Sequence, residues 1–300
     1  MQNNSKSAGV HIDFKKMKKD HQNFKLPKFL RVLTQFQRQI QNIDTQMSEI
    51  TVAISTDQPI YIAFIGDLHL GAVTGRYQVA YKKFQLMREI PALYAINLGD
   101  TVDNFLPNAH PSGQFENLLS PKFQKLLVEE FFNILKGRWL AMINGDHENF
   151  SMISDDFNFA EYLANKMNCP NLGFGGVIHL RLGKRKRIQY DIAVRHRYRF
   201  NSSFNLTHTV KRMREQVCDF DVGAIAHGHQ PAVEHAFVAG KDRIFIRTGA
   251  FKDADRYAQK LGWNGPAHCI IPVVKLYPKK RRMQAYFDVS FVAEELGISY

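Results

Sequence analysis

The chain has 300 residues, 45% of them apolar and 23% charged, which is the composition of an ordinary globular protein that can bury a sizeable core. No segment approaches the roughly 18 consecutive apolar residues of a membrane-spanning helix, and the polar N-terminus lacks the apolar segment of a secretion signal. Three scattered cysteines exclude a disulfide framework, so we expect a cytoplasmic protein with no membrane association.

The net charge of +12 and the pI near 9.5 come from basic residues that are clustered rather than evenly spread. A clustered positive charge attracts polyanions. We therefore favour an anionic partner over the alternative that the charge serves only solubility. Residues 1 to about 25 are polar and contain a short run of lysines at positions 15, 16, 18 and 19. This composition indicates a poorly ordered basic arm.

A second N-terminal feature begins at Pro27, where apolar residues recur at spacings of three and four. They are Phe29, Leu30, Leu33, Phe36, Ile40, Ile43, Met47 and Ile50. The spacing predicts an amphipathic helix that either packs on the core of the protein or joins copies of the chain into a homo-oligomer. We therefore assign residues 1–56 to an arm with a helix, and residues 57–300 to a second domain.

In that second domain, strand-like apolar runs alternate with helical patterns. The first run, 60–65, is followed by a predicted helix from Tyr77 to Ile90, and further helices are predicted from Pro121 to Lys136 and from a cap at Ser154 to about Lys166. Hairpin strands are predicted at 177–182 and 188–194, with later strands near 222–226, 243–247, 269–276 and 283–292. Helix-linked strands followed by hairpin strands predict two sheets packed face to face with helices outside.

Five strand-like runs end in carboxylate or imidazole side chains. The five blocks are Asp67-Leu68-His69, Gly99-Asp100-Thr101-Val102-Asp103, Gly145-Asp146-His147-Glu148, His196, and His227-Gly228-His229. A buried strand that ends in a loop places such side chains at the mouth of a sheet, where metal ligands are often mounted. Five repetitions of this arrangement are not readily produced by accident.

In this order the blocks resemble the calcineurin-like metallophosphoesterase superfamily, whose pattern is D-x-H, G-D-x-x-D, G-N-H with a following acid, a lone H, and G-H-x-H. The resemblance extends from about Tyr61 to Ala250. It departs at Asp146, where the family usually has Asn, and at Ala226, where a glycine usually precedes the first histidine. The first departure changes the charge of the site and the second affects only the backbone. The resemblance implies an α/β fold, a four-layer sandwich of two mixed β-sheets flanked by helices.

The resemblance also implies a role for each residue of the blocks. One metal would be held by Asp67, His69 and His229, and another by Asp146, His196 and His227. Asp100 would bridge the two metals. His147 would protonate the leaving oxygen or hold the phosphate, and Asp103 would orient an imidazole from behind.

Two divalent metals about 3.5–4 Å apart would supply a nucleophile at neutral pH and neutralise charge on a phosphoryl group. Ions that accept both imidazole and carboxylate fit this set of residues better than Mg²⁺, which prefers oxygen. We therefore expect two divalent ions as cofactors, with Mn²⁺ as the first candidate and Fe²⁺, Zn²⁺ or Ni²⁺ as alternatives.

The substrate is indicated less directly. Asn104 stands where related protein phosphatases carry an arginine, which argues against that branch. Eight basic residues and one acid lie between Arg181 and Arg199, so Arg197 and Arg199 are candidates for contacting backbone phosphates, although they could equally form a solvated strand face. His208 is a further candidate for a substrate contact.

Together these features favour a two-metal phosphoesterase that hydrolyses phosphodiester bonds of nucleic acid or nucleotides. More loosely, the sequence is similar to the repair-nuclease branch and to phosphoesterases of phages. Two alternatives stay open: a small-molecule phosphodiesterase or phosphomonoesterase, and a nucleic-acid-binding protein on a degenerate phosphoesterase fold. The second is disfavoured because every ligand position holds a residue that can bind metal.

Overall fold

The computed structural model describes residues 26–44, 48–108, 111–185, 187–260, 262 and 264–299. By contacts along the chain it divides into two units, residues 1–46 and 47–300. The predicted basic arm, residues 1 to 25, lies outside the described residues. The first unit contains helix α2 (Leu26–Asp44), on which Leu30, Leu33 and Phe36 are exposed.

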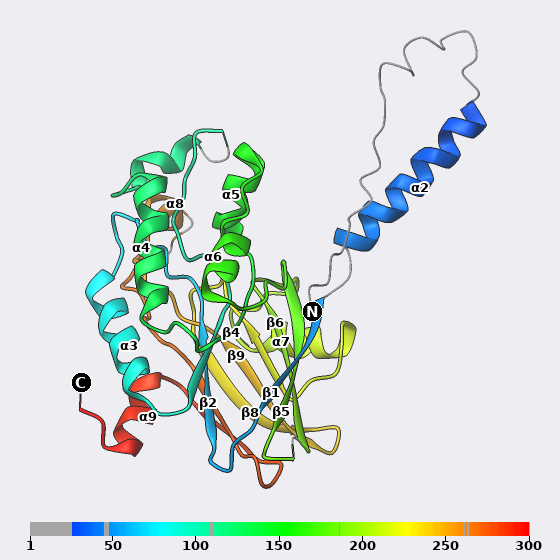
Figure 1. Ribbon diagram of the computed structural model, residues 1–300. Helices are drawn as coiled ribbons and strands as arrows, with labels where there is room; N and C mark the ends of the chain where they lie inside the picture. Colours follow the sequence, from blue (N-terminus) through cyan, green and yellow to red (C-terminus); the bar gives the residue numbers. More distant parts are fainter. Residues whose placement is uncertain are drawn as a thin grey trace. The chain divides into compact units, whose positions relative to one another are not determined.

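The second unit contains two mixed sheets, each with parallel and antiparallel neighbours (Figure 1). The six-stranded sheet has the order β1 (Ser48–Ile54), β5 (Gly175–Leu182), β6 (Ile188–Arg195), β7 (Val222–Ile225), β9 (Lys241–Arg247) and β8 (Ala232–Val238). The five-stranded sheet has the order β11 (Met283–Tyr286), β10 (Val273–Leu276), β2 (Ile60–Ile65), β3 (Leu93–Asn97) and β4 (Trp139–Met142).

The position of strand β2 between two cores explains why its sequence is apolar throughout. Ile60, Ile62 and Phe64 belong to the core between the two sheets. The alternate residues, Tyr61 among them, belong to a second core between the five-stranded sheet and the helices. Because side chains alternate across a strand, a strand that is buried on both faces has no polar position.

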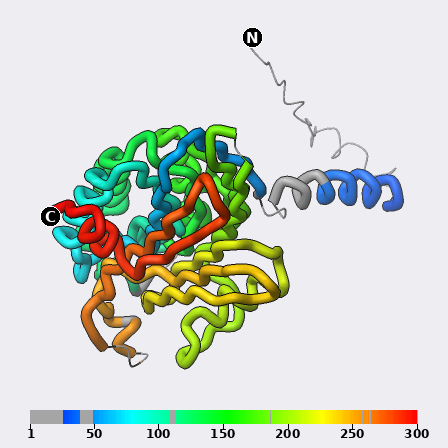
Figure 2. The backbone as a smooth tube through the Cα atoms, turned by 90° about the horizontal axis from the view of Figure 1, so that it is seen from below, coloured from blue at the N-terminus to red at the C-terminus, as the bar shows by residue number. Residues whose placement is uncertain are grey.

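Helices complete the outer layers. The core that covers the five-stranded sheet is built with α3 (Tyr77–Glu89), α4 (Pro121–Asn133), α6 (Phe159–Met167) and α9 (Val289–Leu296). Helix α7 (His208–Gln216) packs with a third core on the six-stranded sheet. The other helices among the described residues are η2 (Pro111–Glu116), α5 (Asp146–Asp155) and α8 (Arg256–Lys260). Figures 1 and 2 both show α9 beside α3, where Lys83 Nζ lies 2.6 Å from Asp288 Oδ1. The predicted four-layer α/β sandwich is therefore confirmed.

The parallel pairs bring the ends of distant strands together. Strand β3 pairs in parallel with β2 and β4, and β7 pairs in parallel with β6 and β9. Neighbouring parallel strands share the edge at which they end, so the loops that follow them meet there.

Three expectations differ from the structure. Residues 48–54 form strand β1, in which Ile50, Val52 and Ile54 alternate onto the core between the sheets. This stretch therefore does not continue the predicted helical pattern. The helix expected to start at Ser154 starts at Phe159, since Asp156 adopts left-handed φ 58° and ends α5. The strand expected over 283–292 is short, because Asp288 accepts a hydrogen bond from Ser290 N and caps α9.

Candidate metal centre

Asp67 and His69 follow β2 directly and are both buried. The backbone N–H of His69 donates to the carbonyl of Asp100 at 3.0 Å, which joins the first block to the second. Asp67 Oδ1 accepts the backbone N–H of His227 at 3.1 Å, which joins the first block to the last. The backbone thus fixes segments that are up to 160 residues apart in the chain.

Several site residues adopt an uncommon backbone conformation. Left-handed φ angles between 44° and 65° occur at Asp67, His69, Asp100, Asn104, His227 and His229. A non-glycine residue there costs on the order of 1–3 kcal/mol and persists only where its surroundings enforce it. Such strain gathers at functional sites, which supports a functional reading of these loops independently of their side chains.

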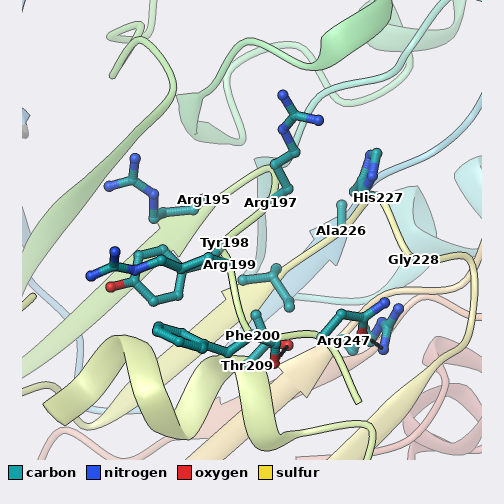
Figure 3. Close-up of a pocket in the computed structure, with 12 residues that line it drawn as sticks. Arg195, Arg197, Tyr198, Arg199, Phe200, Thr209, Ala226, His227, Gly228 and Arg247 are labelled. Carbon is teal, nitrogen blue, oxygen red and sulfur yellow. Dashed lines mark hydrogen bonds between the residues drawn. The ribbon is translucent and has the colours of Figure 1, made fainter. Parts of the chain in front are cut away.

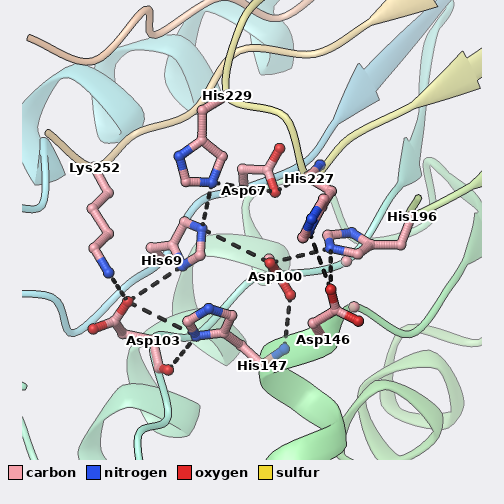
Figure 4. A network of polar contacts seen from close by, with 12 residues as sticks. Asp67, His69, Asp100, Asp103, Asp146, His147, His196, His227, His229 and Lys252 are labelled. Carbon is pink, nitrogen blue, oxygen red and sulfur yellow. Dashed lines mark hydrogen bonds and ion pairs between the residues drawn. The ribbon is translucent and has the colours of Figure 1, made fainter. Parts of the chain in front are cut away.

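Asp100 occupies the middle of the centre (Figure 4). Its Oδ2 lies 3.2 Å from His196 Nε2 and 3.9 Å from His69 Nε2, while its Oδ1 accepts the backbone N–H of His147 at 2.8 Å. The backbone here leaves no room for a side chain at Gly145, where a Cβ would lie 2.2 Å from the nitrogen of Asp100. The second and third blocks are therefore in direct backbone contact.

Glu148 fixes this contact, a role that the sequence analysis did not assign. Its carboxylate is buried and accepts the backbone N–H groups of Asp100, Thr101 and Gly145 at 2.7–2.9 Å, and the Thr101 hydroxyl at 2.6 Å. Four donors compensate the burial of its charge. The sequence feature that could have indicated this role is the position of Glu148 as the acid that ends the third block.

Three overlapping groups of side chains bring ligand atoms within 4.8 Å of one another: Asp67, His69 and His229; His69, Asp100 and His147; and Asp100, His196 and His227. His69 Nε2 lies 3.1 Å from His229 Nε2. Asp146 stands at the edge of the third group, with its Oδ2 3.1 Å from His227 Nδ1 and 3.2 Å from an Arg197 nitrogen. All seven residues proposed as ligands thus lie in one cluster.

Asp103 and Lys252 lie behind the first group (Figure 4). Asp103 Oδ1 is 3.3 Å from His69 Nδ1 and accepts from Lys252 Nζ at 2.7 Å, and its carbonyl oxygen contacts His147 Nδ1. Asp103 therefore has the place expected of a residue that orients an imidazole. No motif in the sequence indicates Lys252.

The electrostatics of the cluster point to a cation. Burial raises the pKa of Asp67 well above its usual value and lowers the pKa of His69 to about 4. Burial opposes protonation of His196, but the Asp100 and Asp67 carboxylates and the Leu98 carbonyl together outweigh it and raise the pKa of His196 to about 10. Asp67 Oδ2 is buried with no hydrogen-bond partner among the described residues. Buried groups of this kind are normally paired or bound to metal, so the residues present fit divalent cations.

The three predicted substrate contacts are arranged differently from one another. Strand β6 ends at Arg195, so Arg197 and Arg199 lie in the loop that follows it and not on a strand face. Arg197 pairs with Asp146, whereas an Arg199 nitrogen lies 3.4 Å from Gln216 Oε1. His208 begins α7 and is not among the described residues that line the cavity beside His227.

A layered sandwich that carries aspartates and histidines at the ends of its strands is the arrangement of a metallohydrolase. Residues 60–233, more than half of the chain, match the model of the family described as calcineurin-like phosphoesterase, and the chain belongs to this family. The predicted resemblance is confirmed. The protein is a metal-dependent phosphoesterase, and its His and Asp clusters could bind the divalent metals that the family uses.

Solved structures similar to this chain include a conserved uncharacterized protein of Streptococcus pneumoniae, described as a predicted phosphoesterase, with 13% identity over 76% of this chain and 99% of that one and a TM-score of 0.36. The calcineurin-like phosphoesterase YfkN of Bacillus subtilis has 9% identity over 80% and 96%, with a TM-score of 0.38. The NAD nucleotidase of Haemophilus influenzae has 12% identity over 76% and 49%, with a TM-score of 0.36. Among curated proteins, no match to the chain was found. Within the described residues, no helix is long and apolar enough to cross a membrane.

Proposed function

We propose that this phosphoesterase uses two metals to hydrolyse phosphodiester bonds of nucleic acid or nucleotides. One observation carries the proposal: a cavity of about 580 Å³ lined by Arg197, Arg199 and Arg247 shares His227 with the metal cluster. Arginines beside a phosphoesterase centre provide positions for phosphates other than the one being cleaved.

In this proposal Asp67, His69 and His229 hold one metal. Asp146, His196 and His227 would hold the other, and Asp100 would contribute a ligand to both. When bound, the two cations would activate a water molecule and neutralise charge on the phosphoryl oxygens. The mixed imidazole and carboxylate ligands favour Mn²⁺, or else Fe²⁺, Zn²⁺ or Ni²⁺.

His147 is the proposed acid. Its Nδ1 contacts the carbonyl oxygen of Asp103, and a carbonyl can only accept, so Nδ1 carries a hydrogen. The second ring nitrogen is then the one that can gain a proton and deliver it to the leaving oxygen. The ring lies 4.6 Å from that of His69, edge to face, which places it at the border of the cluster.

The test is a metal analysis of the purified protein, followed by hydrolysis of bis-p-nitrophenyl phosphate and of short oligonucleotides with Mn²⁺ and with EDTA. We expect bound divalent metal and hydrolysis of both substrates that EDTA abolishes. Cleavage of the small ester without cleavage of any oligonucleotide would refute the nucleic-acid assignment. A metal-free protein that cleaves neither substrate with Mn²⁺ would refute the two-metal mechanism.

Two further assignments belong to the same proposal. Cys169, Cys218 and Cys269 are all free, which supports a reducing compartment such as the cytoplasm. The exposed apolar residues of α2 support a homo-oligomer formed through this helix, and the measurement is the mass of the protein in solution with and without residues 1–46.

A further inference from the structure

The cavity beside His227 has two chemically different sides (Figure 3). Arg197, Tyr198, Arg199 and Phe200 come from the loop after β6, and Arg247 ends β9 on the other side. His227 belongs both to the lining of the cavity and to the metal cluster. A group bound in this cavity would therefore be next to the reacting phosphate.

Arg247 is a buried cation with no ion-pair contact among the described residues, although the Asp67 carboxylate attracts it at longer range. It is 3% exposed, one of its terminal nitrogens donates to Asn201 Oδ1 at 3.1 Å, and its Nε has no hydrogen-bond partner among the described residues. Arg243, four residues earlier on β9, is 2% exposed and pairs with Asp219 at 2.7 Å and with Asp221 at 3.0 Å. The described residues give Arg243 two anions and offer Arg247 none in ion-pair contact. A buried guanidinium in that position suits an anionic ligand.

Gly228 allows close approach to this guanidinium. A Cβ at position 228 would lie 1.5 Å from a terminal nitrogen of Arg247. The glycine between the two histidines of the last block therefore lets the backbone pass directly over Arg247. This contact links the metal-binding loop to the cavity.

The opposite side of the cavity is aromatic. Phe200 has a left-handed φ of 71° and is 41% exposed, although a bulky residue avoids this conformation and a large apolar side chain avoids water. The guanidinium of Arg199 lies over its ring at 5.0 Å, and that of Arg212 at 5.2 Å. Aromatic rings flanked by arginines form the kind of surface on which single-stranded nucleic acids stack their bases.

We propose that this cavity binds the nucleotide adjacent to the cleaved bond of a single-stranded polynucleotide, an inference that rests on the proposed function. The phosphate of that nucleotide binds Arg247, and its base stacks on Phe200 and Tyr198. The volume suits a small-ligand pocket and not a duplex, in which paired bases could not reach the rings.

The test is equilibrium binding of a fluorescent short oligothymidylate in EDTA, at several salt concentrations. We expect Arg247→Met to weaken binding about 10- to 100-fold, the value of a charge-assisted bond, and to lower the salt slope by about 0.7. Phe200→Leu should weaken binding about 5- to 100-fold with an unchanged salt slope, because stacking releases no counterions.

Arg88→Gln is the matched control, since Arg88 is an exposed residue of α3 whose ion pair is with its neighbour Glu89. It should bind as the unmodified protein does. Arg199→Gln replaces an exposed side chain and tests the same cavity if Arg247→Met proves unstable by circular dichroism. Wild-type affinity in folded Phe200→Leu and Arg199→Gln would overturn the proposal, as would equal binding of a duplex of the same length.

Measuring in EDTA separates this inference from the proposed function, because no hydrolysis is required. If the protein cleaves bis-p-nitrophenyl phosphate with metal but the cavity variants bind normally, the proposed nucleotide-binding role of the cavity is refuted and the proposed phosphodiesterase activity stands. If the variants lose binding as expected but the protein cleaves no substrate, the proposed phosphodiesterase activity is refuted and the nucleotide-binding role of the cavity stands. Parallel measurements with oligodeoxyuridylate and oligouridylate, which share the same base, identify the preferred sugar.

Discussion

Asp67, His69 and Asp100 are 0–2% exposed, whereas the side chains of Asp146, His227 and His229 are 30%, 47% and 42% exposed. The first three follow β2 and β3, which lie inside the five-stranded sheet. The other three follow β4, at the edge of that sheet, and β7 of the other sheet. We refer to these two sets as the buried half and the exposed half of the centre.

The two halves differ in what holds them. The buried half is fixed by backbone hydrogen bonds between blocks and by Glu148, Asp103 and Lys252 behind it. In the exposed half the backbone N–H of His227 is held by Asp67 Oδ1, but the Asp146 side chain contacts the exposed side chains of His227 and Arg197. Surface pairs of this kind contribute little, so these side chains can rearrange when a ligand arrives. We therefore expect substitutions in the buried half to cost metal and stability, and those in the exposed half to cost less.

The largest effect is expected for Asp100→Ala, which removes the carboxylate between the two groups. Changes to residues that only orient ligands already cost about 10- to 100-fold, so activity should fall by more than about 100-fold, with loss of bound metal. Metal content and the rate of phosphodiester hydrolysis measure this. Asp242→Ala is the control, because Asp242 is an exposed aspartate on β9. Full metal occupancy in Asp100→Ala would remove Asp100 from the proposed ligands.

Glu148→Gln tests the support beneath Asp100. An amide cannot accept at both ends, so at least one backbone N–H of the second or third block loses its partner. We expect the free energy of unfolding to fall by about 1–3 kcal/mol and metal affinity by about 10- to 100-fold. Urea denaturation and metal titration measure the two losses, and the exposed Glu89→Gln serves as the control. A destabilised variant with normal metal affinity would show that Glu148 supports only the fold.

The aspartates and histidines of both halves were predicted from the sequence, whereas Glu148 and Lys252 behind the buried half were not. The six apolar residues of β2 clearly indicate a strand that is buried on both faces. The aspartates and histidines directly follow apolar runs of this kind. Local sequence patterns do not predict which strands pair when the strands are far apart in the chain. Arg247 and Lys252 reach the site because β9 pairs with β7, and no short-range spacing announces that contact. Helix α5 was not predicted either: it opens at the third block, where the Glu148 carboxylate accepts from Gly145 N.

A smaller effect is expected for Asp103→Asn. The amide keeps an oxygen for Lys252, which also pairs with Asp255 at 2.8 Å, so the fold should be little affected. The negative charge beside His69 Nδ1 is lost, and with it part of the electrostatic orientation of that ring. We expect metal affinity to fall about tenfold with a melting temperature close to that of the unmodified protein. An unchanged metal affinity would contradict the orienting role of Asp103.

The smallest effect is expected for Asp146→Asn, which restores the residue that the family usually carries. The amide oxygen can still serve as a ligand, while one negative charge is removed from a partly exposed position where water screens it. Metal affinity should fall less than about tenfold, and the release of Arg197 from its ion pair should strengthen the binding of anionic substrate, seen as a lower KM. Arg197→Gln separates the two causes, because in that background Asp146→Asn should still loosen metal but no longer lower KM. A loss of metal as large as that of Asp100→Ala would show that the exposed half is held as firmly as the buried half, and the distinction between them would fail.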